Sequence, residues 1–239
     1  MSLPGIQVGP GINIGAGINI GQFSLPTPQY SYRFQGTGAG TSLLSMSPGV
    51  TLGAGDFTIE AWIRCNNVNQ QLGFYGDGAT GALQLYMDNV GSSPADAFQV
   101  NYQGAGQISF NTATLASNTW YYFVVVRQAG LENVFLNGTA SVATADFNDY
   151  ASPTIALGDN YKGSWQGLIF DFRVSNIARY SPSSGSIAVP TAPLTTDANT
   201  LVLFDGSFLT GTDASGNQTI AQGGSGTAVS LVATAPPGL

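Results

Sequence analysis

Histidine is absent from this 239-residue chain, and charged side chains make up only 8% of it. The absence of histidine excludes a Ser-His-Asp triad and any histidine-ligated metal site. The single cysteine, Cys65, excludes an intrachain disulfide, and its place in a strand-like run predicts a buried, inert thiol. A surface with so few charges must consist of Ser, Thr, Asn, Gln and Gly, which is typical of extracellular or virion-surface β proteins.

Basic residues are scarce too, since six Lys and Arg stand against thirteen Asp and Glu, for a net charge of -7. No basic cluster exists, so we expect neither nucleic-acid binding nor attraction to an anionic membrane surface. No run of about 20 apolar residues occurs, so we expect no membrane insertion. The opening Met-Ser-Leu-Pro-Gly is unlike a signal peptide. A phage virion protein fits these features, because lysis releases it without export.

Residues 1–28 differ from the rest because they contain no charged side chain. A hexad of Gly, aliphatic, amide, aliphatic, Gly and spacer occurs three times within them. Its two aliphatic side chains point to one side of an extended segment, and three units are too short to bury that side. We therefore predict an N-terminal docking or oligomerisation arm, the alternative being a flexible Gly-rich tail. The aliphatic residues of this arm are Ile6, Val8, Ile12, Ile14, Ile18 and Ile20.

Residues 29–239 show the patterns of strands and turns throughout. Residues 57–64 alternate with period two, and residues 120–126 are apolar on both faces, as in a central strand covered on both sides. Asn137-Gly138 predicts a two-residue hairpin turn. Residues 165–174 predict a strand with four apolar side chains on one face: Leu168, Phe170, Phe172 and Val174. Many closely spaced strands without a helical period predict an all-β, two-sheet antiparallel jelly-roll sandwich.

Six segments of this region carry a resemblance to a known family: Gly55–Arg64, Thr119–Arg127, Val134–Gly138, Leu157–Gly158, Gly167–Tyr180 and Asp197–Phe204. Their order and spacing resemble the laminin-G-like branch of the concanavalin A-like lectin/glucanase superfamily. The resemblance implies a jelly roll of one convex and one concave sheet that binds glycans or proteins, sometimes with calcium. The end of the fifth segment, with the Pro-rich loop and the Asp-Ala-Asn-Thr-Leu that follow it, also resembles versions found in phage structural proteins. The Gly-Ile-Asn-Ile-Gly repeat resembles arms on virion proteins of marine cyanobacterial phages.

Catalysis has to be considered separately, because the superfamily includes glucanases. Retaining hydrolysis needs two carboxyl groups about 5–5.5 Å apart, which the glucanase branch supplies from a Glu-x-Asp-x-x-Glu strand. This chain holds only two glutamates, Glu60 and Glu132, and neither begins such a motif. We therefore expect no enzymatic activity.

Glycan binding calls for exposed aromatic rings beside amide groups. Four tyrosines lie near Asn or Asp in or beside predicted loops and are candidates, the alternative being core or hairpin packing: Tyr86, Tyr102, Tyr150 and Tyr161. Three loop aspartates are weak candidates for Ca²⁺: Asp77, Asp88 and Asp159. We favour turn and capping roles for these aspartates and expect no cofactor. Asp171 and Arg173 share a predicted strand face, which favours a structural ion pair.

Together these observations predict a non-enzymatic phage virion structural protein of the fibre, tail or capsid-decoration type. Its arm, residues 1–28, docks to other virion proteins or bundles copies into a homo-oligomer such as a trimer. Its lectin-like sandwich is displayed on the particle surface, where it adheres to a host-surface glycan or extends the particle. The alternatives are a secreted bacterial carbohydrate-binding module and a glycoside hydrolase.

Overall fold

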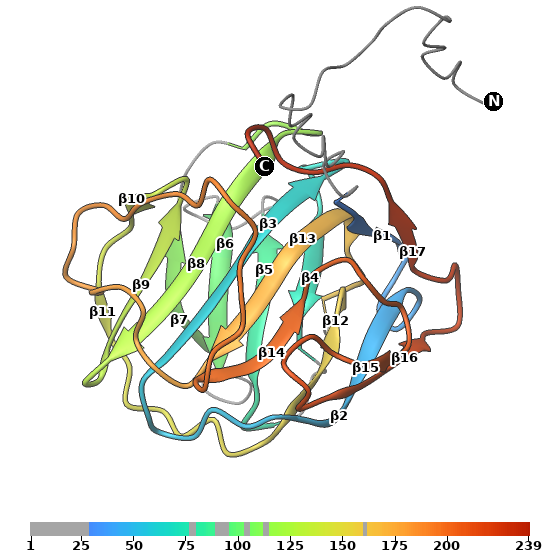
Figure 1. Cartoon of the computed structure of the whole chain (residues 1–239). Coiled ribbons are helices and arrows are strands. Elements are labelled where there is room, and N and C mark those ends of the chain that lie inside the picture. Colours follow the sequence, from blue (N-terminus) through green and yellow to red (C-terminus); the bar gives the residue numbers. More distant parts are fainter. Residues whose placement is uncertain (1–28, 77–79, 89–95, 103–105, 112–114, 160–161) are drawn as a thin grey trace, which may run out of the picture.

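The computed structural model describes residues 29–76, 80–88, 96–102, 106–111, 115–159 and 162–239. These residues form two antiparallel β-sheets packed face to face, and no helix occurs among them (Figure 1). The two-sheet all-β sandwich expected from the sequence is therefore confirmed. The predicted arm, with its six aliphatic residues between Ile6 and Ile20, lies outside the described residues.

The first sheet, sheet A, faces the viewer in Figure 1. Its strands lie in the order β10 (Thr139–Ala140), β9 (Leu131–Leu136), β8 (Trp120–Gln128), β3 (Phe57–Cys65), β13 (Gln166–Ser175), β1 (Ser31–Gln35) and β17 (Ser230–Val232). Two further strands extend it, because β11 (Thr144–Ala145) pairs with β9 and β14 (Thr200–Phe204) pairs with β13.

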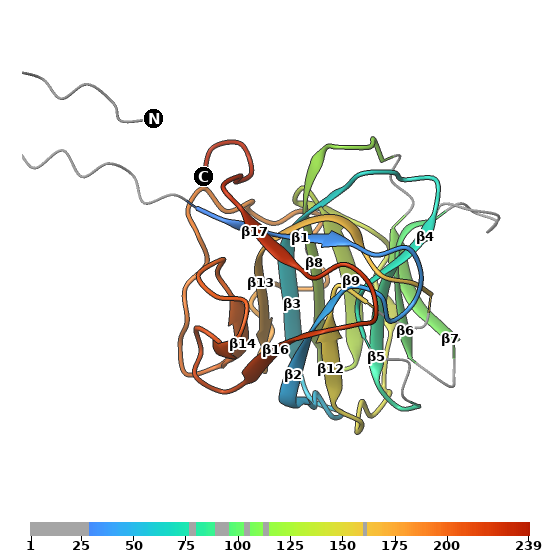
Figure 2. The same cartoon turned by 90° about the vertical axis from the view of Figure 1, so that its right-hand side faces the viewer.

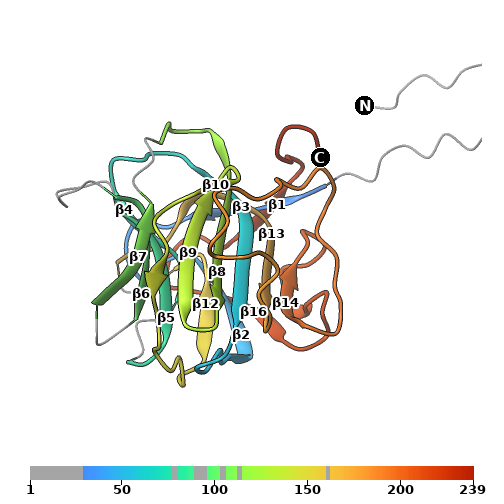
Figure 3. The same cartoon turned by 90° about the vertical axis from the view of Figure 1, so that its left-hand side faces the viewer.

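The second sheet, sheet B, lies behind sheet A, and Figures 2 and 3 show the two layers from the side. Its strands lie in the order β15 (Gly211–Thr212), β16 (Thr219–Gly223), β2 (Leu43–Val50), β12 (Thr154–Leu157), β4 (Gln71–Tyr75), β5 (Leu83–Asp88), β6 (Asp96–Tyr102) and β7 (Gly106–Asn111).

The core between the sheets is rich in aromatic rings that meet edge to face. Phe74 packs in this way against Phe98, Phe123 and Trp165, with ring centroids 6.0, 5.1 and 5.6 Å away. Such contacts add about 0.5–1.5 kcal/mol each to the burial of apolar area. Cys65 is buried beside this core, and burial raises the pKa of its thiol to about 11. The prediction that the Cys65 thiol is buried is confirmed.

Sheet A is covered on its outer face as well. Residues 176–199, which we call the strap, cross in front of this sheet in Figure 1. Strand β8 consequently buries Phe123 and Val125 between the sheets, and Tyr122 and Val124 on the outer side. This arrangement confirms the prediction of a central strand covered on both faces.

Strand β13 departs from the sequence prediction at a β-bulge. Asp171 has a φ of 51°, and the register of β13 against β3 shifts between Phe170 and Arg173. An extra residue in one strand reverses the inside–outside alternation beyond it. Phe170 therefore packs on the outer face, while Phe172 and Val174 pack in the core between the sheets. The prediction of one shared face was wrong for this strand.

The turn between β9 and β10 follows the prediction. Asn137 and Gly138 have φ angles of 48° and 80°, and Leu136 pairs with Thr139 across the turn. Two successive positive φ angles are what a two-residue hairpin turn requires. The Asn137 side chain also accepts a hydrogen bond from the backbone N–H of Tyr122 at 2.8 Å, which fastens the turn to β8.

Candidate functional site

The four candidate tyrosines do not form an exposed sugar-binding surface in the described part of the chain. Tyr86 is 3% exposed and Tyr150 is 1% exposed, so the prediction of exposed rings was wrong for both. The half-buried Tyr102 packs its ring against that of Tyr150, with centroids 5.4 Å apart. Tyr161 lies outside the described residues. All six residues of β5 are buried, so side chains on both faces of this strand are shielded from solvent, and Tyr86 is one of them.

Tyr86 belongs to a buried hydrogen-bond network on the outer face of sheet B. Its hydroxyl donates to Oε1 of Gln99 at 2.5 Å and accepts from Nδ2 of Asn101 at 3.4 Å. The carboxylate of Asp88 accepts from Nε2 of Gln71 at 2.6 Å. Because these polar side chains are bonded across neighbouring strands, they stabilise the sheet.

Asp88 and Asp159, the two described aspartates considered for calcium, serve separate hydrogen-bond networks. Asp88 accepts from Nε2 of Gln71 on β4, as described above, and from Nε2 of Gln99 on β6 at 3.5 Å. Asp159 accepts from the backbone N–H of Gly40 at 2.7 Å and from the Ser164 hydroxyl at 3.0 Å, so it joins two loops. Asp77 lies outside the described residues. Within the described residues, no group of three or more acidic or cysteine side chains is arranged to hold a metal ion.

The two glutamates, Glu60 and Glu132, are both 0% exposed. Glu60 accepts from Arg173 Nε and Nη2 at 2.9 and 2.6 Å, and from the hydroxyls of Tyr122 and Tyr180. Arg173 therefore pairs with Glu60, and the predicted ion pair between Asp171 and Arg173 was wrong. The β-bulge at Asp171 is the physical reason, because it takes that carboxylate to the backbone N–H of Leu194 at 2.8 Å.

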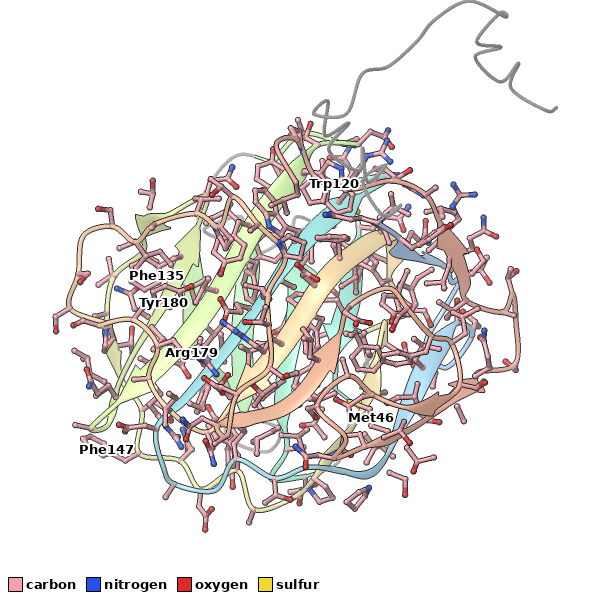
Figure 4. All side chains as sticks on the ribbon, in the orientation of Figure 1. Met46, Trp120, Phe135, Phe147, Arg179 and Tyr180 are labelled. Carbon is pink, nitrogen blue, oxygen red and sulfur yellow. The ribbon has the colours of Figure 1, made fainter. Side chains whose placement is uncertain are left out.

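These contacts fasten the strap to sheet A. Tyr180 at the start of the strap meets Glu60, and Arg173 also donates to the Thr195 carbonyl near its end at 2.8 Å. Arg179 forms a bidentate pair with Asp197 at 2.9 and 2.7 Å, which joins the two ends of the strap. Figure 4 shows Tyr180 and Arg179 in front of the sheet. We interpret this buried ionic cluster as structural.

A different group of loops has the features of a binding surface, at the end of the sandwich where β3 begins and β8 ends. Loops 51–56, 129–130 and 146–149 meet there, and we call them the Phe147 tip. Arg127, the last buried residue of β8, joins them. It donates to the carbonyls of Gly53 at 2.8 Å, Gly55 at 2.6 and 2.9 Å, and Asn148 at 2.8 Å, and to the Asp146 carboxylate at 3.0 Å.

Arg127 is also held between two aromatic rings. Its guanidinium carbon lies 4.8 Å from the ring centroid of Phe57 and 5.0 Å from that of Tyr150. All five of its N–H donors are used, so its position is determined in every direction. The backbone of the Phe147 tip is consequently fixed from inside by one buried side chain.

Asp146 fixes the turn that carries Phe147. Its carboxylate accepts from the backbone N–H and the Nδ2 of Asn148, at 3.0 and 2.7 Å, and from the Tyr150 hydroxyl at 3.0 Å. The backbone N–H of Asp146 donates to the Gly130 carbonyl at 2.9 Å. The residues on both sides of Phe147 therefore have determined positions.

The Phe147 side chain itself lies on Gly130 and faces solvent. It is 80% exposed, although leaving a phenyl ring in water forfeits about 1.5–3 kcal/mol of burial free energy. A Cβ on Gly130 would lie 2.1 Å from Cε1 of the ring, so only glycine leaves room for the ring at this position. Gly130 also has a φ of 77°, which other residues rarely adopt. An exposed ring on a backbone that is already fixed by hydrogen bonds can stack on a flat ligand without losing further conformational freedom.

Two exposed carboxylates accompany the ring. Asp56 accepts a hydrogen bond from the backbone N–H of Ala129, the neighbour of Gly130, through Oδ1 at 2.8 Å. Asp149 lies beside Gly53, with Oδ1 3.8 Å from the position of a Cβ on that glycine. The tip therefore offers an apolar face with hydrogen-bond acceptors around it.

Sequence reasoning missed Phe147, although a signal for it existed. The segment Asp146-Phe-Asn-Asp149 holds one aromatic residue among polar residues that favour turns, outside any alternating strand pattern. An aromatic side chain in such a segment has no strand face along which to enter the core.

The Phe147 tip is remote from the place where the described chain begins. Strand β1 lies in the upper part of the sandwich in Figure 1, and Phe147 is labelled at the lower left of the same view in Figure 4. The tip is therefore free to contact a ligand if the chain is held through residues 1–28.

Comparison with known proteins identifies the fold family. The profile of the concanavalin A-like lectin/glucanases superfamily matches residues 37–184. A candidate carbohydrate-binding protein from Bacteroides ovatus superposes with a TM-score of 0.60 at 16% identity, over 85% of this chain and 59% of that protein. A heptameric pentraxin from Limulus polyphemus superposes with a TM-score of 0.54 at 13% identity, over 83% of this chain and 96% of the pentraxin. No curated protein sequence matches this chain.

Proposed function

Since this chain belongs to the concanavalin A-like lectin/glucanases superfamily, we propose that it is a non-enzymatic carbohydrate-binding domain that contacts its ligand through the Phe147 tip. The observation that carries the proposal is the Phe147 ring, which is 80% exposed on a fixed mount. The flat face of a phenyl ring matches the apolar face of a sugar ring, and carboxylate oxygens accept from sugar hydroxyls. The Bacteroides protein of the same fold is itself a candidate carbohydrate-binding protein, which supports the same ligand class.

The state of the two glutamates supports a binding role without catalysis. Glu60 is engaged by Arg173 and two tyrosine hydroxyls, and both Glu60 and Glu132 are 0% exposed. A retaining hydrolase needs two carboxyl groups that both reach the scissile bond. The burial of both glutamates therefore supports the proposal that neither serves as acid or nucleophile.

We further propose that the domain is displayed on a phage particle for adhesion to a host-surface glycan. The charge-poor composition and the uncharged Gly/Ile repeat of residues 1–28 support this role. The arm would dock the domain on other virion proteins or bundle it into a homo-oligomer such as a trimer, and the remote Phe147 tip would face the host. Deletion of residues 5–22 should abolish incorporation into particles while the sandwich stays folded. Incorporation of the truncated protein at normal copy number would refute the docking role.

The carbohydrate-binding role is tested with the full chain on a panel of immobilised neutral and acidic polysaccharides. We expect retention on at least one of them, and at least tenfold weaker retention of Phe147→Ala. Val142→Ala is the matched control, because Val142 is 78% exposed and lies outside the Phe147 tip, and it should bind like the unmodified chain. Failure of the unmodified chain to bind any polysaccharide would refute the proposed function. Equal binding by Phe147→Ala would refute the assignment to the tip.

A further inference from the structure

The charges at the Phe147 tip determine which classes of sugar it can bind. This inference rests on the proposed carbohydrate-binding function. Three acidic residues are exposed among those whose side chains the structure describes: Asp56, Asp149 and Asp197. Asp197 is paired with Arg179 at the strap. The two exposed acids that form no ion pair therefore both lie at the tip, Asp56 in the loop that ends at β3 and Asp149 in loop 146–149.

No cation at the tip offsets these carboxylates. Arg127 is the one basic residue in or next to the three loops of the tip, and it is 1% exposed. Its five N–H donors are all bonded to the protein, and its charge is paired with the buried Asp146. The tip consequently presents a negative surface, and an anionic ligand would find no free donor of positive charge there.

The exposed carboxylates have free acceptor capacity. Asp56 uses Oδ1 for the backbone N–H of Ala129, and no described protein group donates to its Oδ2. No described group donates to either carboxylate oxygen of Asp149. Hydroxyl groups can donate to these oxygens, and hydrogen bonds to a charged acceptor are about twice as strong as neutral ones. A sugar ring with one apolar face and several hydroxyls can therefore use both the Phe147 ring and the two carboxylates.

We infer that the Phe147 tip binds neutral hexopyranose rings and discriminates against sugars that carry a carboxylate. The ring of the sugar stacks on Phe147, and its hydroxyls donate to Asp56 and Asp149. A sugar carboxylate at about 6 Å from each of the two aspartates would weaken binding about tenfold in water at low ionic strength. Salt at 0.15 M, with a Debye length of about 8 Å, reduces this to about threefold.

The test uses pairs of ligands that differ at one carbon atom. The dissociation constants of methyl glucopyranoside and methyl galactopyranoside are compared with those of the corresponding methyl uronides, by ligand-observed NMR on the full chain at low salt. We expect the neutral member of at least one pair to bind about tenfold more tightly than its uronide. The difference should narrow at 0.5 M salt, and it should close in Asp56→Asn/Asp149→Asn, which keeps one acceptor oxygen in each side chain but removes the charge.

Three outcomes would overturn the inference. They are equal or tighter binding of the uronides at low salt, a preference that survives in the double variant, and no binding of either neutral sugar. The first two leave the proposed function standing, because they show carbohydrate binding with a different selectivity. The third outcome, no binding of either neutral sugar, is interpreted together with the results of the polysaccharide panel. If a polysaccharide is retained and Phe147→Ala loses it, the carbohydrate role stands and only the hexopyranose assignment fails.

Discussion

Replacement of Arg127 tests whether one buried side chain organises the Phe147 tip. Arg127→Met keeps most of the apolar volume but removes the ion pair with Asp146 and all five hydrogen bonds. Loss of one partner of a buried pair costs about 3–5 kcal/mol, because the other charge stays buried. Asp146 keeps donors from Asn148 and Tyr150, which limits its penalty. We therefore expect a loss of about 3–4 kcal/mol in the free energy of unfolding.

Urea denaturation followed by tryptophan fluorescence and by circular dichroism measures this loss. Arg33→Met is the control, because the Arg33 side chain is exposed and forms no hydrogen bond or ion pair with the described residues, and the substitution should change stability by less than about 0.5 kcal/mol. Asp146→Asn in the Arg127→Met background should recover part of the loss, since it removes the uncompensated charge. A loss below about 1 kcal/mol for Arg127→Met, or no recovery in the double variant, would contradict the reasoning.

Three further substitutions make separate predictions. Burial raises the pKa of Asp171 to about 7, so the folded state binds its proton more tightly than the unfolded state does, and stability should fall as the pH rises from about 4 to about 7. Asp171→Asn should remove about 2–4 kcal/mol of that fall in urea denaturation, and asparagine tolerates the positive φ. Gly130→Ala should cost about 1–2 kcal/mol, displace the Phe147 ring and abolish polysaccharide retention. Tyr86→Phe should cost about 1 kcal/mol and leave retention unchanged.

Each of these predictions can fail on its own. An unchanged pH profile for Asp171→Asn would mean that this carboxyl titrates normally in the folded protein. Normal polysaccharide retention by Gly130→Ala would mean that binding does not depend on the present position of the Phe147 ring against Gly130. Loss of polysaccharide retention in Tyr86→Phe, with the fold intact, would indicate that the binding surface lies on the outer face of sheet B and not at the Phe147 tip.

Local sequence patterns were sufficient to predict the sandwich and some of its details. The apolar run of β8 and the Asn137-Gly138 turn are encoded by neighbouring residues, because strand burial and turn dihedrals depend on local spacing. The bulge at Asp171 was not predictable in this way. Nothing in its neighbours marks a positive φ, and the contact that holds it comes from Leu194 in the strap.

The candidate site shows the same limit. Proximity of Tyr86 to asparagine and aspartate in the sequence suggested exposure, but cross-strand partners such as Gln99 are set by the sheet register and bury it. Phe147 is presented to solvent because the end of β8 with Arg127 and Gly130, the loop with Gly53 and Gly55, and the turn at Asp146 meet from three separate segments. Such a meeting is a property of tertiary structure, so spacing along the chain does not reveal it.

The most direct measurement of the central claim follows the phenylalanine rings while sugar is added. The full chain, labelled with ¹³C in its phenylalanine rings, is titrated with the polysaccharide fragment that it retains best, and Phe147→Ala assigns the signal of Phe147. The account predicts saturable shifts of the Phe147 signal, while the signals of buried rings such as Phe74 and Phe123 stay in place. Binding of the fragment with no change in the Phe147 signal would contradict it.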